Sequence, residues 1–149
     1  MSDSINPHIA QVLLVEDNED DVELTLEALA DSKVRMDIHV VRNGIEAMAF
    51  LRQEGEYGAK PRPDLVLLDL NLPIKSGHEV LKDIRSDPQL TELPVVVLTT
   101  SHYEADIQNA YRLHANCYIT KPVDFVQFAN IVRQIEGFWL QLVTLPNRR

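Results

Sequence analysis

The chain has 149 residues and a net charge of −9, because 23 acidic residues outnumber 14 basic ones. This balance argues against nucleic acid and against an anionic membrane surface as partners, since both attract basic proteins. A single cysteine permits no internal disulfide, and no apolar run approaches the ~18 residues of a membrane span. We therefore expect a cytoplasmic protein with one domain.

Apolar segments typical of buried strands alternate along the chain with segments whose apolar residues recur at helical spacing. The first half contains a predicted strand at residues 12–15, a helix at 19–30, a weaker strand at 37–41 and a helix that begins at Asn43 and Gly44. Residues 53–62 contain two glycines and Pro61, and Pro63 follows directly, so we predict a loop there.

The second half repeats this alternation. It contains predicted strands at residues 65–68, 95–98 and 117–119, and helices from Ser76 to just before Pro88, at 105–113 and at 123–135. Strict alternation of strand and helix predicts an α/β fold with right-handed crossovers. We expect a flavodoxin-like, doubly wound, five-stranded parallel sheet with strand order 2-1-3-4-5.

Reactive side chains follow the predicted strands at their carboxyl ends, where open α/β sheets form their ligand crevice. Glu16 and Asp17 follow the first strand, Asp69 follows the third, and Thr99 follows the fourth. Three carboxylates this close together repel one another, so one must hold a proton or a cation must neutralise the set. Oxygen-only ligands suit Mg²⁺ or Mn²⁺, and Mg²⁺ often binds a phosphate oxygen as well.

Lys121 follows the fifth predicted strand and can reach the same crevice, where it would pair with Asp69 and later with a phosphoryl oxygen. An aspartate nucleophile, a divalent cation, a lysine and a hydroxyl meet the needs of phosphoryl transfer. Each residue alone has an ordinary explanation, such as a helix cap, a turn or a surface lysine. Their coincidence at one sheet edge, in this order, favours a phosphoryl-accepting site.

These motifs together resemble the CheY-like receiver domain of two-component response regulators. The resemblance covers roughly residues 12–135 and rests on the acidic pair Glu16–Asp17, the turn from Asp69 to Gly77, Thr99, Tyr118, and Lys121 with Pro122. It implies one receiver domain over residues 1–149, with its core at 11–136 and an extension at 137–149. It implies a phosphoacceptor switch and not an enzyme that turns over a substrate.

The resemblance also implies roles for individual residues. Asp69 would accept a phosphoryl group from a phosphohistidine kinase, and Thr99 and Tyr118 would form the switch. Mg²⁺ would be held by Glu16, Asp17, Asp69 and the backbone carbonyl of Asn71. Segments 48–57, 94–101, 116–118 and 138–146 resemble the free-standing regulators that partner cyanobacterial and bacterial phytochromes, which implies a phytochrome-type sensor histidine kinase as partner.

The C-terminal extension is strongly apolar. Left exposed, its side chains would form an unusually large hydrophobic patch; they are Phe138, Trp139, Leu140, Leu142, Val143 and Leu145. The extension either folds back over its own domain or packs against a second copy as a dimer arm. We favour the homodimer.

Three other functions compete with a phosphorylated switch. A phosphatase of the haloacid dehalogenase type needs an acid two residues after its nucleophile, where this chain has Asn71. A flavin-binding module needs a neutral first loop, whereas residues 16–21 are strongly acidic and would repel a phosphate. A receiver that works without phosphate remains a third alternative, although the complete acidic set and Lys121 disfavour it.

Overall fold

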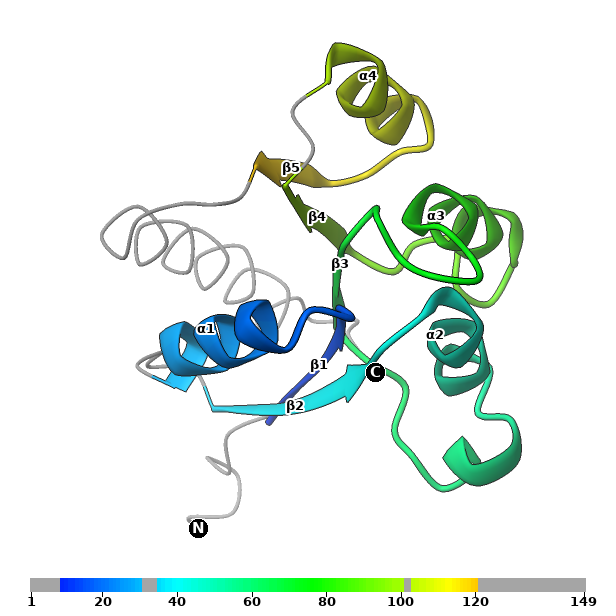
Figure 1. Ribbon diagram of the computed structural model, residues 1–149. Helices are drawn as coiled ribbons and strands as arrows, with labels where there is room; N and C mark the ends of the chain where they lie inside the picture. The colour runs from blue at the N-terminus through cyan, green and yellow to red at the C-terminus, as the bar shows by residue number, and fades with distance from the viewer. Residues whose placement is uncertain (1–8, 31–34, 101–102, 121–149) are drawn as a thin grey trace, which may run out of the picture.

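The computed structural model describes residues 9–30, 35–100 and 103–120. Strands and helices alternate through them (Figure 1) in the order β1 (Ala10–Val15), α1 (Glu19–Ala30), β2 (Met36–Val41), α2 (Gly44–Leu51), the 3-10 turn η2 (Gly55–Tyr57), β3 (Leu65–Leu68), α3 (Gly77–Ser86), β4 (Val95–Thr99), α4 (Glu104–Arg112) and β5 (Cys117–Thr120). The strands form one parallel sheet in the order β2-β1-β3-β4-β5, which confirms the predicted α/β class and strand order. The predicted helix at 123–135 and the extension at 137–149 lie outside the described residues.

The central strands are buried on both faces because their alternate side chains enter two separate cores. In β1, Leu13 and Val15 belong to one core, and Val12 and Leu14 belong to the other. The same alternation continues in β3 and β4. Each fully buried side chain of this kind stabilises the fold by about 1.5–3 kcal/mol.

Helices cover the two faces of the sheet unequally among the described residues. The core on one face is completed by α2 and α3, through residues such as Phe50, Leu51 and Leu81, and by Ala110 of α4. The core on the opposite face is completed by α1, through Val22 and Leu29. Figure 1 shows α1 on one side of the sheet and α2 and α3 on the other. No helix in the described ranges has the length and hydropathy needed to cross a membrane.

Strand β2 is longer than predicted and contains His39, which made its prediction weak. Two contacts of the His39 ring explain why this residue lies in a strand. A ring nitrogen lies 2.8 Å from Gln11 Oε1, and the ring packs against Phe50 of α2 with a centroid separation of 5.2 Å. Burial is the main cause that lowers the pKa of His39, and the positive charge of Lys60 lowers that pKa further.

The amino ends of β4 and β5 are tied to α3 by Arg85. Its guanidinium donates five hydrogen bonds of 2.6–3.0 Å, to the carbonyl oxygens of Thr91, Leu93 and His114 and to Asn116 Oδ1. Asn116 Oδ1 also accepts a bond of 2.7 Å from the backbone N–H of Val95. Burial lowers the pKa of Arg85, and the fork of donors is matched by acceptors from two segments, residues 91–93 and 114–116.

Candidate functional site

The carboxyl ends of β1 and β3 finish level with each other, which brings their following residues together. Val15 pairs with Leu68 in the sheet register, and the backbone N–H of Asp69 donates to Val15 O at 3.1 Å. Leu68 in turn lies opposite Val97 of β4, two residues before Thr99. The predicted convergence at this edge is therefore confirmed for the first, third and fourth strands.

Glu16, Asp17 and Asp69 form an acidic cluster at this edge. One carboxylate oxygen from each lies within 4.8 Å of the others. Glu16 is only 3% exposed and Asp69 only 7%, whereas Asp17 faces solvent. Three like charges in a partly desolvated crevice repel one another, and a small divalent cation is the kind of ligand that offsets this cost.

Backbone donors help to hold two of these carboxylates. The backbone N–H of Asn18 donates to Glu16 Oε2 at 3.2 Å, and that of Asn71 donates to Asp69 Oδ1 at 3.3 Å. Asn18 also begins α1, because its Oδ1 accepts from the backbone N–H of Asp21 at 3.0 Å, as an N-cap does. Asn18 is therefore the N-cap of α1.

The loop after Asp69 is pressed against the first turn of α3. A Cβ on Gly77 would lie 2.2 Å from the carbonyl oxygen of Asp69 and 2.6 Å from the Cα of Leu70, so only glycine fits there. The Gly77 N–H donates to Leu70 O at 3.0 Å. Ser76, where the helix was predicted to begin, caps α3 in a reciprocal capping box with Glu79.

The same loop is held from its other side by α2. A Cβ on Gly44 would lie 2.3 Å from the carbonyl oxygen of Lys75, and Asn43 caps α2 by accepting from the Glu46 N–H at 2.8 Å. The Lys75 ammonium pairs with Asp83 of α3 at 2.7 Å. The loop that carries Asp69 is therefore fixed between two helix N-termini.

Ile74 bears the backbone strain of this loop. Its φ is 72°, in the left-handed region that β-branched residues avoid, and its side chain is 78% exposed. The Lys75 N–H donates across it to Pro73 O at 2.7 Å, which closes a tight turn. Strain of this kind persists only where the surrounding contacts fix the backbone, as Gly44 and Gly77 do here.

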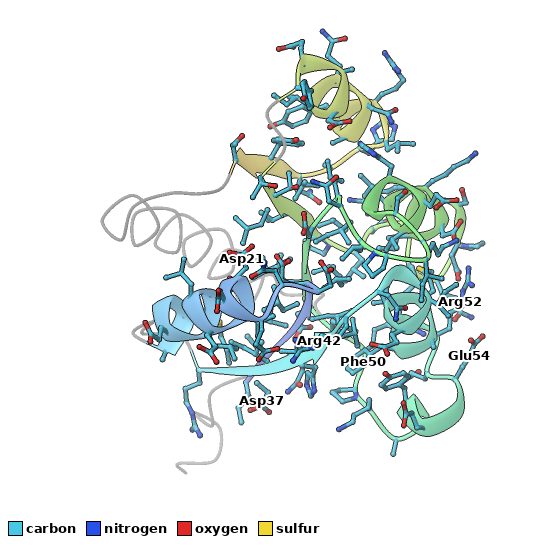
Figure 2. All side chains as sticks on the ribbon, in the orientation of Figure 1. Asp21, Asp37, Arg42, Phe50, Arg52 and Glu54 are labelled. Atoms are coloured by element: carbon cyan, nitrogen blue, oxygen red, sulfur yellow. The ribbon has the colours of Figure 1, made fainter. Side chains whose placement is uncertain are left out.

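Arg42 extends the site's charged surface at the carboxyl end of β2. Its guanidinium forms an ion pair with Glu19 in the first turn of α1. Figure 2 shows Arg42 between β2 and the start of α1, with Asp21 on that helix. The pair engages Glu19, which is not a member of the acidic cluster of Glu16, Asp17 and Asp69.

Thr99 and Tyr118 lie on one face of the sheet. Thr99 is fully buried and pairs with Thr120 in the register, while Tyr118 pairs with Val97 and is half-buried against the same core as α4. The ring of Tyr118 packs against that of Tyr111 on α4, with a centroid separation of 6.5 Å and an interplanar angle of 41°. This contact gives Tyr118 a packing role, and its switch role stays a prediction that rests on the family resemblance.

Several predicted residues are not placed by the structure. Lys121 and the six apolar residues from Phe138 to Leu145 lie outside the described ranges. Asn71 is exposed and contacts Asp69 through its N–H, and the role of its carbonyl oxygen stays a prediction. The structure adds Gly77, Ile74 and Tyr111, whose contacts were not predicted; Ile74 and Gly77 lie within the predicted turn from Asp69 to Gly77, whereas Tyr111 lies in no motif of the sequence.

The donors in the acidic cluster fit a hard divalent cation. All three are carboxylate oxygens, from residues held by strand ends that the sheet keeps level. Mg²⁺ and Mn²⁺ accept such ligands and leave positions for water and a phosphate oxygen. The edge can therefore bring a cation beside a nearly buried aspartate, which is the arrangement phosphoryl transfer to a carboxylate requires.

Comparisons with known proteins agree with this fold. The family model of the response regulator receiver domain matches residues 12–133. The response regulator Rcp1 of Synechocystis sp. (strain ATCC 27184 / PCC 6803 / Kazusa) is 51% identical over 146 residues, which cover 98% of this chain and 99% of that protein.

Solved structures give the same result. The crystal structure of the phosphorylated cyanobacterial phytochrome response regulator RcpA is 56% identical with a TM-score of 0.85, and the match covers 94% of this chain and 100% of that chain. The Mn²⁺-bound form of Rcp1 is 50% identical with a TM-score of 0.83, covering 92% and 99% of the two chains. The chain therefore belongs to the response regulator receiver domain family and, within it, is similar to phytochrome-associated response regulators.

Proposed function

We propose that Asp69 is the phosphoacceptor of a signalling switch. Receiver domains as a family accept phosphoryl groups from histidine kinases. In this chain, an Asp69 carboxylate oxygen would attack the phosphorus of a phosphohistidine, the P–N bond would break as the new P–O bond forms, and the leaving imidazole would take up a proton. The observation that carries the proposal is the cluster of Asp69, Glu16 and Asp17 within 4.8 Å at the level ends of β1 and β3.

The other roles follow from the same chemistry. Glu16, Asp17, Asp69 and the Asn71 carbonyl would hold Mg²⁺ or Mn²⁺, which would offset charge on the phosphoryl oxygens. Lys121 would pair with Asp69 and then with the phosphoryl group. Support for a divalent cation comes from the oxygen-only donors and from Rcp1, which has a Mn²⁺-bound form.

Phosphorylation would then change the surface near α4 and β5. The phosphoryl group adds charge and acceptor oxygens at Asp69. Thr99 would move toward it, and Tyr118 would rotate inward behind Thr99. Thr99 and Tyr118 share a sheet face, two register positions apart on β4 and β5, which supports this coupling.

The partner that we propose is a phytochrome-type sensor histidine kinase. Similarity to RcpA, a cyanobacterial phytochrome response regulator, supports it.

We also propose a single receiver domain with its core at residues 11–136 and an extension at 137–149 that mediates a homodimer. A molecular mass equal to one chain at micromolar concentration, with and without phosphorylation, would contradict the dimer.

The phosphoacceptor is tested by intact mass after incubation with a low-molecular-weight phosphodonor and Mg²⁺. We expect wild type to gain one phosphoryl group that is stable to acid and labile to base, and Asp69→Asn to gain none. Asp37→Asn, the same substitution at an exposed carboxylate of β2, is the matched control and should behave as wild type. Equal phosphorylation of Asp69→Asn would sink the proposal, and steady turnover of the donor by wild type would indicate an enzyme instead.

A further inference from the structure

Helix α4 contacts the rest of the described structure mainly through its carboxyl end. Ala110 is its one fully buried residue, and Ala115 and Leu113 continue the contact into the turn before β5. Arg85 fixes that turn through His114 O and Asn116 Oδ1. Figure 1 shows α4 standing beside β5 at the end of the sheet.

Tyr111 lies on the last turn of α4, close to this fixed end, and is 49% exposed. An exposed tyrosine of this kind ordinarily needs no explanation. Its ring, however, packs in a tilted arrangement on Tyr118, whose side chain shares a sheet face with Thr99. A chain of neighbours thus runs from Thr99 through Tyr118 to a ring at the surface.

We infer that Tyr111 is a positioning residue for Tyr118. The inference rests on the proposed function, in which Tyr118 moves between two positions. The Tyr111 ring lies on the solvent side, so contact with it holds Tyr118 outward and opposes its inward rotation toward Thr99. Because Arg85 anchors the turn that separates the two tyrosines in the chain, Tyr111 stays in place while Tyr118 moves.

The size of the effect follows from the ring contact. An aromatic pair changes the ratio between two conformations by about two- to tenfold beyond what buried area contributes. By linkage, a ligand that favours the inward position binds more tightly by the same factor when Tyr111 is removed. Tyr111 would therefore tune how readily the switch responds, although it lies on a different element from Asp69 and Thr99.

The test uses the full chain with Mg²⁺ and beryllofluoride as the phosphoryl analogue. Fluorotyrosine NMR, with the Tyr118 signal assigned from Tyr118→Phe, reports the Tyr118 position, and titration gives the beryllofluoride affinity. In Tyr111→Ala we expect the Tyr118 signal before beryllofluoride to shift toward its saturated position, and the affinity to rise about two- to tenfold. Tyr111→Leu, which keeps an apolar side chain without a ring, should do the same.

Two controls separate ring contact from a general change in the helix. Tyr111→Phe keeps the ring and should match wild type, as should Arg112→Ala, an exposed neighbour on the same turn. If Tyr118 and the affinity stay unchanged in Tyr111→Ala and Tyr111→Leu while wild type responds to beryllofluoride, the positioning role is overturned and the switch stands. If wild type shows no response at all, the proposed function fails and the positioning role falls with it.

Discussion

The two edges of the sheet solve the problem of partly buried charge in opposite ways. At the amino edge, Arg85 has acceptors for five hydrogen bonds, all supplied by the chain itself. At the carboxyl edge, Glu16, Asp17 and Asp69 gather three negative charges within 4.8 Å. One lysine such as Lys121 could offset only one of them.

This difference teaches which edge is built for stability and which for a ligand. A charge that is satisfied by backbone carbonyls is fixed in place and leaves nothing for a partner to bind. Like charges that level strand ends hold together destabilise the folded protein until a cation binds, so cation binding stabilises it. The carboxyl edge also contains the strained φ of Ile74, as functional loops often do.

The largest effect should come from the amino edge. Arg85→Met leaves the carbonyl oxygens of Leu93 and His114 without their donor, and we expect the free energy of unfolding to fall by about 3 kcal/mol. Urea unfolding measures this loss. The free energy of unfolding of Arg85→Lys should lie between those of wild type and Arg85→Met, because the ammonium group keeps the charge but lacks the planar fork of donors. Divalent affinity of the folded protein should not change; a tenfold loss would show that the two edges are coupled.

Gly77→Ala should affect both stability and ligand binding at the carboxyl edge. The added Cβ would meet the Asp69 carbonyl oxygen at 2.2 Å, so the loop must shift. We expect a loss of about 2 kcal/mol in the free energy of unfolding, together with weaker Mn²⁺ binding in a fluorescence or calorimetric titration. Gly58→Ala is the control, because its Cβ would lie 3.4 Å from the nearest atom, Gly55 O, and its effect should be small.

Ile74→Asn should raise stability by relieving the strain. Asparagine tolerates a positive φ, and little buried area is lost from a side chain that is 78% exposed. We expect the free energy of unfolding to increase by about 1 kcal/mol. A matched Ile45→Asn variant on α2, also exposed but in a helix, should show no such gain; an equal gain there would mean that loss of exposed apolar surface, and not strain, is responsible.

Asp17→Asn separates repulsion from ligand binding. When a chelator removes divalent cations, we expect the free energy of unfolding of Asp17→Asn to exceed that of wild type by about 0.5 kcal/mol, because one repelling charge is gone; this is the size usual for exposed charge pairs. With excess Mn²⁺, wild type should gain more stability than the variant, because the variant has lost a ligand. Asp20→Asn removes the same charge from the first turn of α1 and should leave the stabilisation by Mn²⁺ unchanged.

His39 belongs to neither edge, and we expect its contribution to the pH dependence of stability to be the smallest of these effects. Burial, with Lys60 adding to it, lowers the pKa of His39 in the folded protein below the 6.5 of an unfolded chain. The unfolded chain therefore binds this proton more readily, and stability falls as the pH drops below about 6.5. Urea midpoints of His39→Gln should fall less than those of wild type between about pH 7.5 and 5.5; an equal fall would assign the slope to other groups.

The sequence predicted those parts of the site that depend on strand ends. Runs such as residues 65–68 are apolar at every position, as in a strand buried on both faces, and parallel strands that alternate with helices end at one edge. Glu16, Asp17, Asp69 and Thr99 could therefore be grouped without coordinates. Ser76 was predictable for a similarly local reason, since a capping box needs only its own helix.

Features that depend on packing between elements were beyond the sequence. A β-branched residue predicts a negative φ, so the backbone of Ile74 follows only from the two glycines that press on its loop. The contact between Tyr111 and Tyr118 requires the angle at which α4 meets β5. The acceptors of Arg85 come from two segments, residues 91–93 and 114–116, that no spacing in the chain relates.

Strand β2 ends the described sheet, with β1 as its one neighbour. An unpaired strand edge is a template on which another molecule can add a strand and begin to aggregate. Figure 2 shows Asp37 projecting from β2, and both Asp37 and Arg35 are exposed. Charges on this border make strand addition by another copy unfavourable, so this edge of the sheet is a poor starting point for fibres.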